Sequence, residues 1–354
     1  MPVDFGSDLP HEEHVKFGLN YAIYKGPGVT AGEMFHETVE EVVLAESLGF
    51  DCALVSEHHF VDNDMFPSPV VALAYLAAKT SRIRVGGGVF LLPLYDPLRL
   101  AEDTAVLDVI SRGRFILGIG QGYRPEEFQA FGRRLADRPS LMREGVRLVR
   151  RLWTEPSVTH EGKHFRVKDV CLTPKPVQPS PPVWVAAKKR KAVELAAEIG
   201  DGWYADPITP ISIIKENKAH WTAALRAHGK DPARQTFAYY REFFVGADDD
   251  SAWKIGGENG VMGEYEMYSS FGHLVDDDGR PLPANQREGL VELAKRRTTV
   301  GGPERCRADL EMIRETLAPT HVVLKTRWGG VPHAEAMRSI RRAGEQVIPQ
   351  FADA

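Results

Sequence analysis

The sequence predicts a (β/α)8 barrel, a fold of the α/β class in which eight parallel strands alternate with helices and close into a cylinder. Short apolar runs rich in β-branched residues alternate along the chain with longer segments whose apolar residues recur at helical spacing. The runs are almost continuously apolar, which is typical of parallel strands buried on both faces. Eight such strands can be counted and no linker divides the chain, so we expect a single domain over residues 1–354 with insertions near 155–182 and 247–298.

The first half of the chain predicts four strand–helix repeats. Strands are expected at 15–24, 51–59, 83–92 and 114–120, and helices at 31–50, 68–80, 96–111 and through 143–153. The first of these helices carries an apolar stripe that includes Phe35 and Val43, and Gly49 ends it. Asp96 is placed as the N-cap of the third helix, with Pro97 at its first helical position. Parallel strands need crossover helices of this kind, so the order favours a parallel sheet.

The second half continues the pattern with two interruptions. Residues 158–182 look like a β-hairpin followed by a proline-rich approach. Residues 247–298 are polar and glycine-rich, and long insertions of this kind act as lids or mobile segments, with a flexible surface loop as the alternative. The remaining strands are expected at 183–187, 201–205, 237–246 and 320–326, and the remaining helices at 192–200, 303–317 and 333–351.

Composition limits the class of protein. The formal net charge of -5 gives no reason to expect nucleic acid or an anionic membrane as a partner. The N-terminus lacks the pattern of a signal peptide, and no apolar run reaches the roughly 18 residues of a membrane span. Cys52, Cys171 and Cys306 are scattered without a CxxC motif, so we expect buried free thiols in a protein of the reducing cytoplasm.

Glu57, His58 and His59 stand at the end of the second predicted strand, where barrels of this kind place their active sites. Imidazole exchanges protons near neutral pH, which suits acid–base catalysis. Neighbours on a strand point to opposite faces, so we expect His58 to face the barrel mouth, His59 to face the wall, and Glu57 to orient one imidazole. The same alternation argues against a metal ion held by both histidines. The structural alternative is that one histidine caps a helix and the other packs.

Two glycine-rich strand ends follow, in VGGGVF (85–90) and LGIGQGY (117–123). Glycines weaken a central strand, so either a flat ligand lies against the backbone or the barrel packs tightly there. A strand that ends in glycines before a helix can hold a phosphate, but the third glycine of the dinucleotide fingerprint is replaced by Tyr123.

A basic run, Lys188 to Lys191, stands at the start of another predicted helix. Cations there oppose the helix dipole, which costs stability when no anion is present. The run is therefore interpreted either as a solvated basic turn or as a phosphate site formed by the helix N-terminus and these side chains.

Taken in order, these segments resemble the bacterial luciferase-like, flavin-dependent monooxygenase family. The likeness extends over most of the chain and is densest at 83–132, where a DP-R-AED helix, an S-GR turn and a strand ending in G-G appear in register. SEHHF at 56–60, GDGW at 200–203 and VGGPERC at 300–306 support it. The family fold is a (β/α)8 barrel, in agreement with the pattern of elements.

The resemblance implies a role for each candidate residue. His58 corresponds to the catalytic histidine near the reactive edge of the flavin, with Glu57 and His59 as its neighbours. Gly88–Val89 corresponds to the place where the family carries a non-prolyl cis peptide beneath the flavin ring. The cofactor-binding candidates are Gly88, Val89, Gly120, Gln121, Gly122, Tyr123, Ala187, Lys188 and Lys189, of which Lys188 and Lys189 match the loop whose backbone holds the phosphate. Gln121 departs from the family, since luciferase has a phosphate-gripping arginine there; Arg124 or the basic run would supply the missing charge.

The resemblance implies an oxidoreductase that uses reduced FMN and O2 to oxygenate a small organic substrate, apolar or carbonyl-containing. No nicotinamide fingerprint is present, so reduced flavin is expected from a separate flavin reductase. The apolar helix VVALAYLAA (70–78), together with the habit of the family, implies a homodimer.

Three alternatives stay open. The first is hydride transfer with a deazaflavin, coenzyme F420; members of that branch typically carry a Ser-Asp-His type ending on the second strand, so Glu57-His58-His59 favours FMN. The second is a non-catalytic flavin-binding protein, and the third is a metal-dependent barrel hydrolase.

Overall fold

Eight parallel strands close a barrel in the computed structural model, which describes residues 14–22, 26, 28–61, 67–270, 272, 274–277, 279–280, 282 and 287–352. Around the barrel the order is β1 (Lys16–Tyr21), β2 (Cys52–Val55), β3 (Arg84–Gly87), β5 (Phe115–Gly120), β8 (Val183–Ala186), β9 (Gly202–Ala205), β10 (Thr236–Val245) and β12 (His321–Lys325). Pairing of β9 with β10 and of β12 with β1 completes the cylinder. The predicted fold class is confirmed, and every strand starts within one residue of its predicted range.

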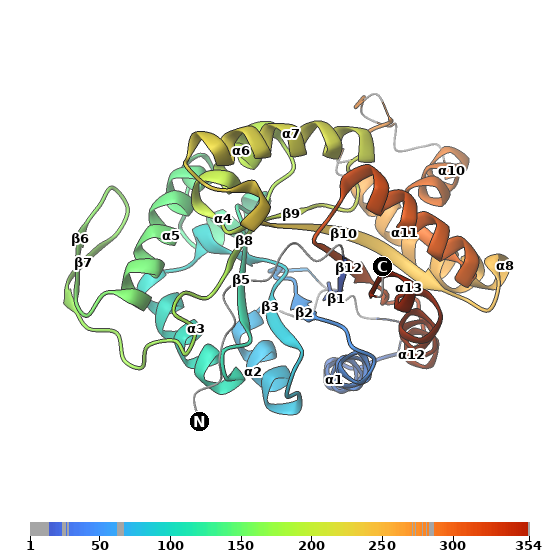
Figure 1. The fold of residues 1–354 in the computed structure, drawn as a ribbon, viewed down its shortest axis with the longest axis horizontal. Coiled ribbons are helices and arrows are strands. Elements are labelled where there is room, and N and C mark those ends of the chain that lie inside the picture. Colours follow the sequence, from blue (N-terminus) through green and yellow to red (C-terminus); the bar gives the residue numbers. More distant parts are fainter. Residues whose placement is uncertain are drawn as a thin grey trace.

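A ring of helices surrounds the strands (Figure 1). The main ones are α1 (Ala31–Ser47), α2 (Pro69–Lys79), α3 (Pro97–Ser111), α5 (Arg138–Thr154), α6 (Arg190–Ile199), α7 (Ile211–Ala227), α11 (Pro303–Leu317) and α12 (His333–Arg342). The predicted start of α3 is confirmed, because the Asp96 carboxylate accepts hydrogen bonds from the backbone of Leu98 and Arg99, and Pro97 is the first helical residue. Gly49, with φ +84°, follows the end of α1 as predicted.

Side chains from alternate strand positions fill the inside of the barrel: Cys52, Leu54, Ile116, Trp184, Tyr204, Ala238 and Val323, which we call the interior cluster. β3 and β5 approach so closely that a Cβ on Gly118 would overlap the carbonyl oxygen of Gly87. A Cβ on Gly86 would lie 2.6 Å from the carbonyl oxygen of Ile116. Tight packing of the two strands therefore accounts for these three glycines without a ligand.

The insertion at 155–182 contains the predicted hairpin. β6 (Val158–Glu161) pairs antiparallel with β7 (Arg166–Val170) and projects from the side of the barrel (Figure 1). Glu144 on α5 anchors it, since its carboxylate accepts hydrogen bonds from the backbone of His164 and Phe165. The hairpin lies away from the barrel mouth and supplies none of the candidate residues.

The insertion at 247–298 is largely helical where it is described. It contains α8 (Asp249–Ala252), a π-helix (Trp253–Val261), α9 (Met262–Ser270) and α10 (Arg287–Arg297). Its buried side chains pack with Phe244, Trp328 and Val331 into a second hydrophobic cluster, which we call the roof cluster. A Cβ on Gly256 would press on the Phe244 ring, and one on Gly260 would lie 2.9 Å from Trp328. Gly256 and Gly260 therefore reflect close helix packing, whereas Gly272 and Gly279 stand at positive φ outside the helices. Residues 271, 273, 278, 281 and 283–286 of this insertion lie outside the described residues.

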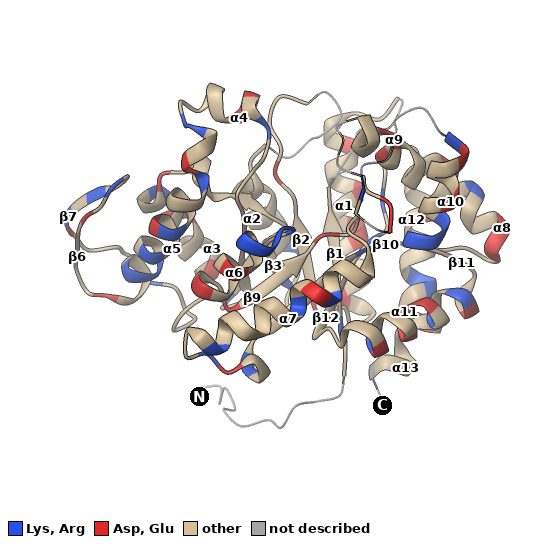
Figure 2. Cartoon of the chain, turned by 90° about the horizontal axis from the view of Figure 1, so that it is seen from above, with Lys and Arg blue, Asp and Glu red and all other residues tan. Residues whose placement is uncertain are grey.

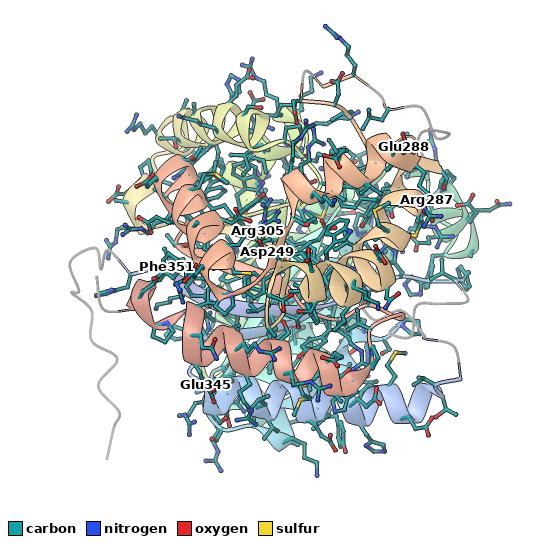
Figure 3. All side chains as sticks on the ribbon, turned by 90° about the vertical axis from the view of Figure 1, so that its right-hand side faces the viewer. Asp249, Arg287, Glu288, Arg305, Glu345 and Phe351 are labelled. Carbon is teal, nitrogen blue, oxygen red and sulfur yellow. The ribbon has the colours of Figure 1, made fainter. Side chains whose placement is uncertain are left out.

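Figure 3 views the molecule from the side of this insertion, with Asp249 of α8 beside Arg305 of α11. Asp249 Oδ1 accepts a hydrogen bond of 2.7 Å from the backbone N–H of Gly302, which precedes α11. The insertion is thus attached to the outer helices as well as to the strand ends.

The cysteines are free, as predicted, but only two of the three are buried. Cys52 lies inside the barrel and Cys306 in α11. Cys171 is exposed, so the prediction of burial is wrong for this residue, because it follows the β6–β7 hairpin outside the core. Within the described part of the chain, no helix has the length and apolar character needed to cross a membrane.

Candidate functional site

The predicted site residues lie at the C-terminal ends of β2, β3, β5 and β8, four strands that are neighbours in the barrel. Glu57 to His59 follow β2, and Gly88–Val89 follow β3. Gly120 to Tyr123 stand at the end of β5, and Ala187 to Lys189 follow β8. The fold therefore brings all of these positions to one sector of the barrel mouth, although they are spread over more than 130 residues of sequence.

His58 is half-buried at this sector, and its nearest carboxylate belongs to Glu127. The Nδ1 atom of His58 lies 3.5 Å from Oε1 of Glu127, a residue of α4 (Pro125–Ala130). The ring also makes an edge contact with Tyr123, with centroids 6.1 Å apart. Sequence reasoning missed Glu127; the only signal was the pair of acids in RPEEF, directly after the β5 strand end.

His59 is buried and is the histidine that Glu57 orients. Nε2 of His59 lies 2.7 Å from Oε1 of Glu57, while the other carboxylate oxygen accepts a hydrogen bond from the backbone of Leu91. The His59 ring packs on Phe131, with centroids 4.7 Å apart. Burial, and then the charge of Glu57, raise the pKa of the neighbouring Tyr95 hydroxyl well above its ordinary value. Glu57 and His59 therefore form a pair in the wall behind His58.

Glu127 joins the two histidines electrostatically. Its Oε1 atom accepts a hydrogen bond of 3.0 Å from the backbone N–H of His59 and also faces His58. Burial raises the pKa of Glu127, but His58, the His59 N–H and Arg124 together outweigh it, so the net pKa is lower than the ordinary value. The carboxylate is therefore ionised at neutral pH and holds a negative charge next to the His58 ring.

Arg124 belongs to the same network. One of its amino groups donates a hydrogen bond of 2.6 Å to the carbonyl oxygen of His59 and lies 3.3 Å from Glu127. Arg124 and the basic run were the two sources of positive charge considered for a phosphate. The Arg124 guanidinium is already bound in the wall, where it neutralises the buried Glu127 carboxylate. The basic run at 188–191 remains as the source of charge.

The Gly88–Val89 peptide bond is cis, as the resemblance implied. Its Gly88 carbonyl oxygen accepts hydrogen bonds from the Asn20 amide at 3.1 Å and from the Ser56 hydroxyl at 2.7 Å. Asn20 also donates to the Tyr204 hydroxyl at 2.8 Å. A Cβ on Gly88 would overlap the Asn20 amide, so only glycine fits between the peptide and this pair. The orientation of the cis peptide is therefore fixed by polar side chains from β1, β9 and the end of β2.

Asn20, Ser56 and Tyr204 were not among the predicted residues. Their signal was available in the alternation of strand positions, since Leu54 and Ser56 share a face, and so do Gly18 and Asn20. A polar side chain on the inner face of an apolar strand needs a partner; Asn20 and Ser56 find one at Gly88, and Tyr204 finds one at Asn20.

The loop before α6 is held in place by side chains that donate hydrogen bonds to its backbone carbonyl oxygens. The carbonyl oxygen of Ala187 accepts a hydrogen bond from the Trp203 indole at 2.8 Å, and that of Lys188 accepts one from the Asn217 amide at 3.1 Å. Lys189 is the N-cap of α6, and no described side chain caps this helix. Figure 2 shows the cluster of Lys and Arg at this helix start. An uncapped helix N-terminus flanked by cations is suited to an anion such as a phosphate.

Metal binding has no support in the described residues, where no group of three His, Cys, Asp or Glu side chains is placed to hold an ion. His58 and His59 each face a different carboxylate, in keeping with the alternation of strand neighbours.

Comparison with known proteins gives several relatives. The alkanal monooxygenase alpha chain of the Kryptophanaron alfredi symbiont is 32% identical over 187 residues, 52% of each chain. The oxygenase component of the flavin-dependent trigonelline monooxygenase of Acinetobacter baylyi is 26% identical over 67% of this chain and 66% of that protein. The F420-dependent glucose-6-phosphate dehydrogenase of Kineococcus radiotolerans is 37% identical over 176 residues, 46% of this chain and 49% of that protein. Each match thus spans one half to two thirds of the relative's length.

The structure itself is similar to that of the monooxygenase RslO1 from Streptomyces bottropensis, with a TM-score of 0.85 and 30% sequence identity. That likeness covers 96% of this chain and 100% of the other. A family model described as luciferase-like monooxygenase matches residues 15–320. The chain therefore belongs to the luciferase-like monooxygenase family.

Proposed function

We propose that this chain is the oxygenase component of a flavin-dependent monooxygenase that uses reduced FMN and O2 to oxygenate a small organic compound, apolar or carbonyl-containing. The observation that carries the proposal is the position of His58, half-buried next to ionised Glu127, on the same sector of the mouth as the Gly88–Val89 cis peptide and the uncapped start of α6. One relative is named as an oxygenase component, so we propose a separate flavin reductase as partner.

The residues of this sector fit FMN in two respects. Val89 and Ala186 present partly buried apolar surface on either side of Gly120, where a Cβ would press on Val89 at 2.6 Å. Because Gly120 has no side chain, the apolar surface between Val89 and Ala186 stays flat enough for a planar ring to lie on it. The start of α6, with Lys188 and Lys189, suits the single phosphate of FMN.

Within this proposal, reduced FMN supplies the activation of O2 when it is bound. The chain binds and orients the cofactor and the substrate, and His58 transfers protons. Glu127 faces the Nδ1 atom of His58. In the tautomer that carries its proton on Nδ1, the Nε2 atom is free to accept a proton from substrate or solvent. The roof cluster, which includes Phe244 of β10 and Trp328 after β12, would exclude water from the neighbouring part of the mouth.

F420-dependent hydride transfer is the alternative function. The observation in its favour is the 37% identity to an F420-dependent glucose-6-phosphate dehydrogenase over 176 residues, which is higher than the identity to either monooxygenase relative named above. Titration of the protein with FMN and with F420, followed by absorbance and fluorescence, separates the two, because only the cofactor that fits will bind tightly.

The phosphate site is tested by charge reversal at the basic run. Replacing Lys188 and Lys189 together by Glu should weaken FMN by about tenfold or more, since charge-assisted hydrogen bonds contribute roughly 1.5–3 kcal/mol. Riboflavin, which lacks the phosphate, should bind almost as before. A fluorescence titration with both ligands measures this, and equal losses for FMN and riboflavin would exclude a phosphate site at 188–189.

The role of His58 is tested by measuring peroxide and product in parallel. His58→Ala should leave FMN binding nearly intact and lower oxygenation of decanal, chosen because of the alkanal monooxygenase relative, by about 10²- to 10⁴-fold, the usual effect of losing a positioned acid–base group. Peroxide release should continue, since O2 still meets bound reduced flavin. His59→Ala is the matched control and should act through stability, because His59 is buried against Glu57. Wild-type product per flavin in the His58 variant would make this histidine structural.

The wall network is tested by the pH dependence of stability. The pKa of folded Glu127 is below its ordinary value of 4.5, so its stabilisation is present above that value and is lost as the pH falls through the folded pKa. Glu127→Gln should therefore lower the free energy of unfolding at pH 7 by about 1.5–3 kcal/mol, and by less at acid pH. Urea unfolding at both pH values measures this, with exposed Glu126→Gln as the control. An unchanged difference across the pH range would contradict the assignment.

We also propose a homodimer formed through α2 and α3. Val71 on α2 is 67% exposed, and α3 exposes Val106, Val109 and Ile110. Clustered apolar side chains of this kind mark association surfaces. Sedimentation at micromolar concentration should show a dimer for the wild type, a monomer for Ile110→Glu and a dimer for the control Met312→Glu on α11. A monomeric wild type would refute this surface as an interface.

A further inference from the structure

A second set of polar residues faces the inside of the barrel, on the side opposite to the predicted site. Glu242 of β10 and Lys325 of β12 are register partners near the C-terminal ends of their strands. Ala238 and Val323 belong to the interior cluster, so Glu242 and Lys325, at even spacing along the same strands, face the same interior. With Glu264 of α9 they form a group that we call the polar layer.

The polar layer separates the barrel interior from the roof cluster. Phe244, two residues beyond Glu242 on the same strand face, packs in the roof cluster. Lys325 Nζ donates a hydrogen bond of 2.7 Å to Glu264 Oε2, and the Trp328 indole donates another of 2.7 Å to the same oxygen. The charges of Lys325 and Glu264 therefore cancel, and α9 is tied directly to the strand ends.

The polar layer is continuous with the wall of the predicted site. Tyr240, two residues before Glu242, stacks on Tyr204 with ring centroids 5.7 Å apart. The Tyr204 hydroxyl binds Asn20, which binds the carbonyl oxygen of Gly88. A molecule that reached from the cis peptide across the inner wall of the barrel would thus meet Glu242 and Lys325.

Glu242 differs from the other buried acids of the described chain because both of its carboxyl oxygens lack hydrogen-bond partners. It is fully buried, and neither carboxylate oxygen has a hydrogen-bond partner in the described parts of the chain. Burial, and then the charge of Glu264, raise its pKa well above the ordinary value, against the opposing effects of Lys325 and Arg241. The Tyr265 hydroxyl also opposes the rise, but no well-formed hydrogen bond joins the two groups. Burial without a partner therefore favours the protonated, uncharged form of Glu242, which has one proton to donate.

A buried acid without a partner destabilises the fold, and an apolar residue of similar size would remove that cost. Groups of this kind are found where a ligand completes the hydrogen bonds. The neutral acid donates to an oxygen, and Lys325 adds a positive field balanced by Glu264. An ammonium group would lie next to a cation and a carboxylate next to Glu264, so an uncharged group suits the layer best.

We propose that the polar layer binds an uncharged oxygen-bearing group, a hydroxyl or carbonyl, of the organic substrate, and that Glu242 donates the hydrogen bond that orients it. This inference rests on the proposed function for the presence of an organic substrate in the mouth. Glu264 and Tyr265 place α9 over the layer, so a substrate that reaches Glu242 has to displace α9 from its position.

Binding without flavin tests the inference separately from the proposed function. Trp328 is buried and bound to Glu264, so its fluorescence reports on the polar layer, and Trp328→Phe identifies its share of the signal. The probes are 2-decanone, 2-decanol, decane, decanoate and decylamine, with cyclohexanone, cyclohexanol and cyclohexane as a second skeleton. The variants are Glu242→Gln, which keeps a donor, Glu242→Leu, which removes it, and Asp309→Asn as control. Asp309 is an acid with a raised pKa on outer helix α11.

In the wild type, the ketone or alcohol of at least one skeleton should bind about tenfold more tightly than the hydrocarbon, and decanoate and decylamine should bind no better than decane. Glu242→Leu should abolish this preference and raise the melting temperature, whereas Glu242→Gln and Asp309→Asn should retain it. The inference is overturned if hydrocarbon and oxygenated probes bind alike, if neither oxygenated probe binds, or if Glu242→Leu keeps the preference. FMN titration of the same samples shows independently whether the proposed function stands.

Discussion

Closure of the barrel is the constraint on which the rest of the structure depends. Pairing of β9 with β10 and of β12 with β1 places the C-terminal ends of all eight strands around one opening. Residues that the chain separates widely, such as Asn20 and Tyr204, become hydrogen-bonded neighbours only because the cylinder closes. The close approach of β3 to β5 at Gly87 and Gly118 has the same origin, and the Gly88–Val89 peptide follows it directly, where Asn20 and Ser56 hold it.

The helical spacing of apolar residues and the alternation of strands with helices were enough to predict the barrel and its strands, because each strand is a distinct apolar run with a helix after it. They also predicted the end of the barrel at which the candidate residues gather. They were not enough to predict which carboxylate meets which histidine. Glu57 lies next to His58 in sequence but binds His59, while His58 faces Glu127 from α4, 69 residues later. Contacts between segments far apart in sequence depend on register and side-chain direction, which a single sequence does not specify.

Sequence reasoning failed where burial depends on contacts that local pattern does not specify. Val43 falls just outside the buried arc of α1 and is 42% exposed, whereas the acidic Glu41 is fully buried because Arg327 and His333 reach it from beyond β12. The glycines of 247–298 suggested a lid or mobile segment, with a flexible loop as the alternative, whereas Gly256, Gly257 and Gly260 pack a π-helix against aromatic rings. For Glu41 and for Gly256 and Gly260 the deciding partner is distant in sequence, so composition alone was a poor guide.

The placement of the insertion divides the barrel mouth into two territories. The sector formed by β2, β3, β5 and β8 carries the cis peptide, the glycine-rich end of β5 and the start of α6, whereas β10, β12 and α9 contribute side chains packed beneath a separate hydrophobic cluster. Substitutions within the roof cluster itself therefore spare the residues that hold the cis peptide, whereas substitutions at Tyr240 or Tyr204 act on both territories. A barrel organised in this way can change its substrate specificity during evolution while its cofactor site stays the same. Protein engineers could therefore randomise the residues beneath the roof cluster.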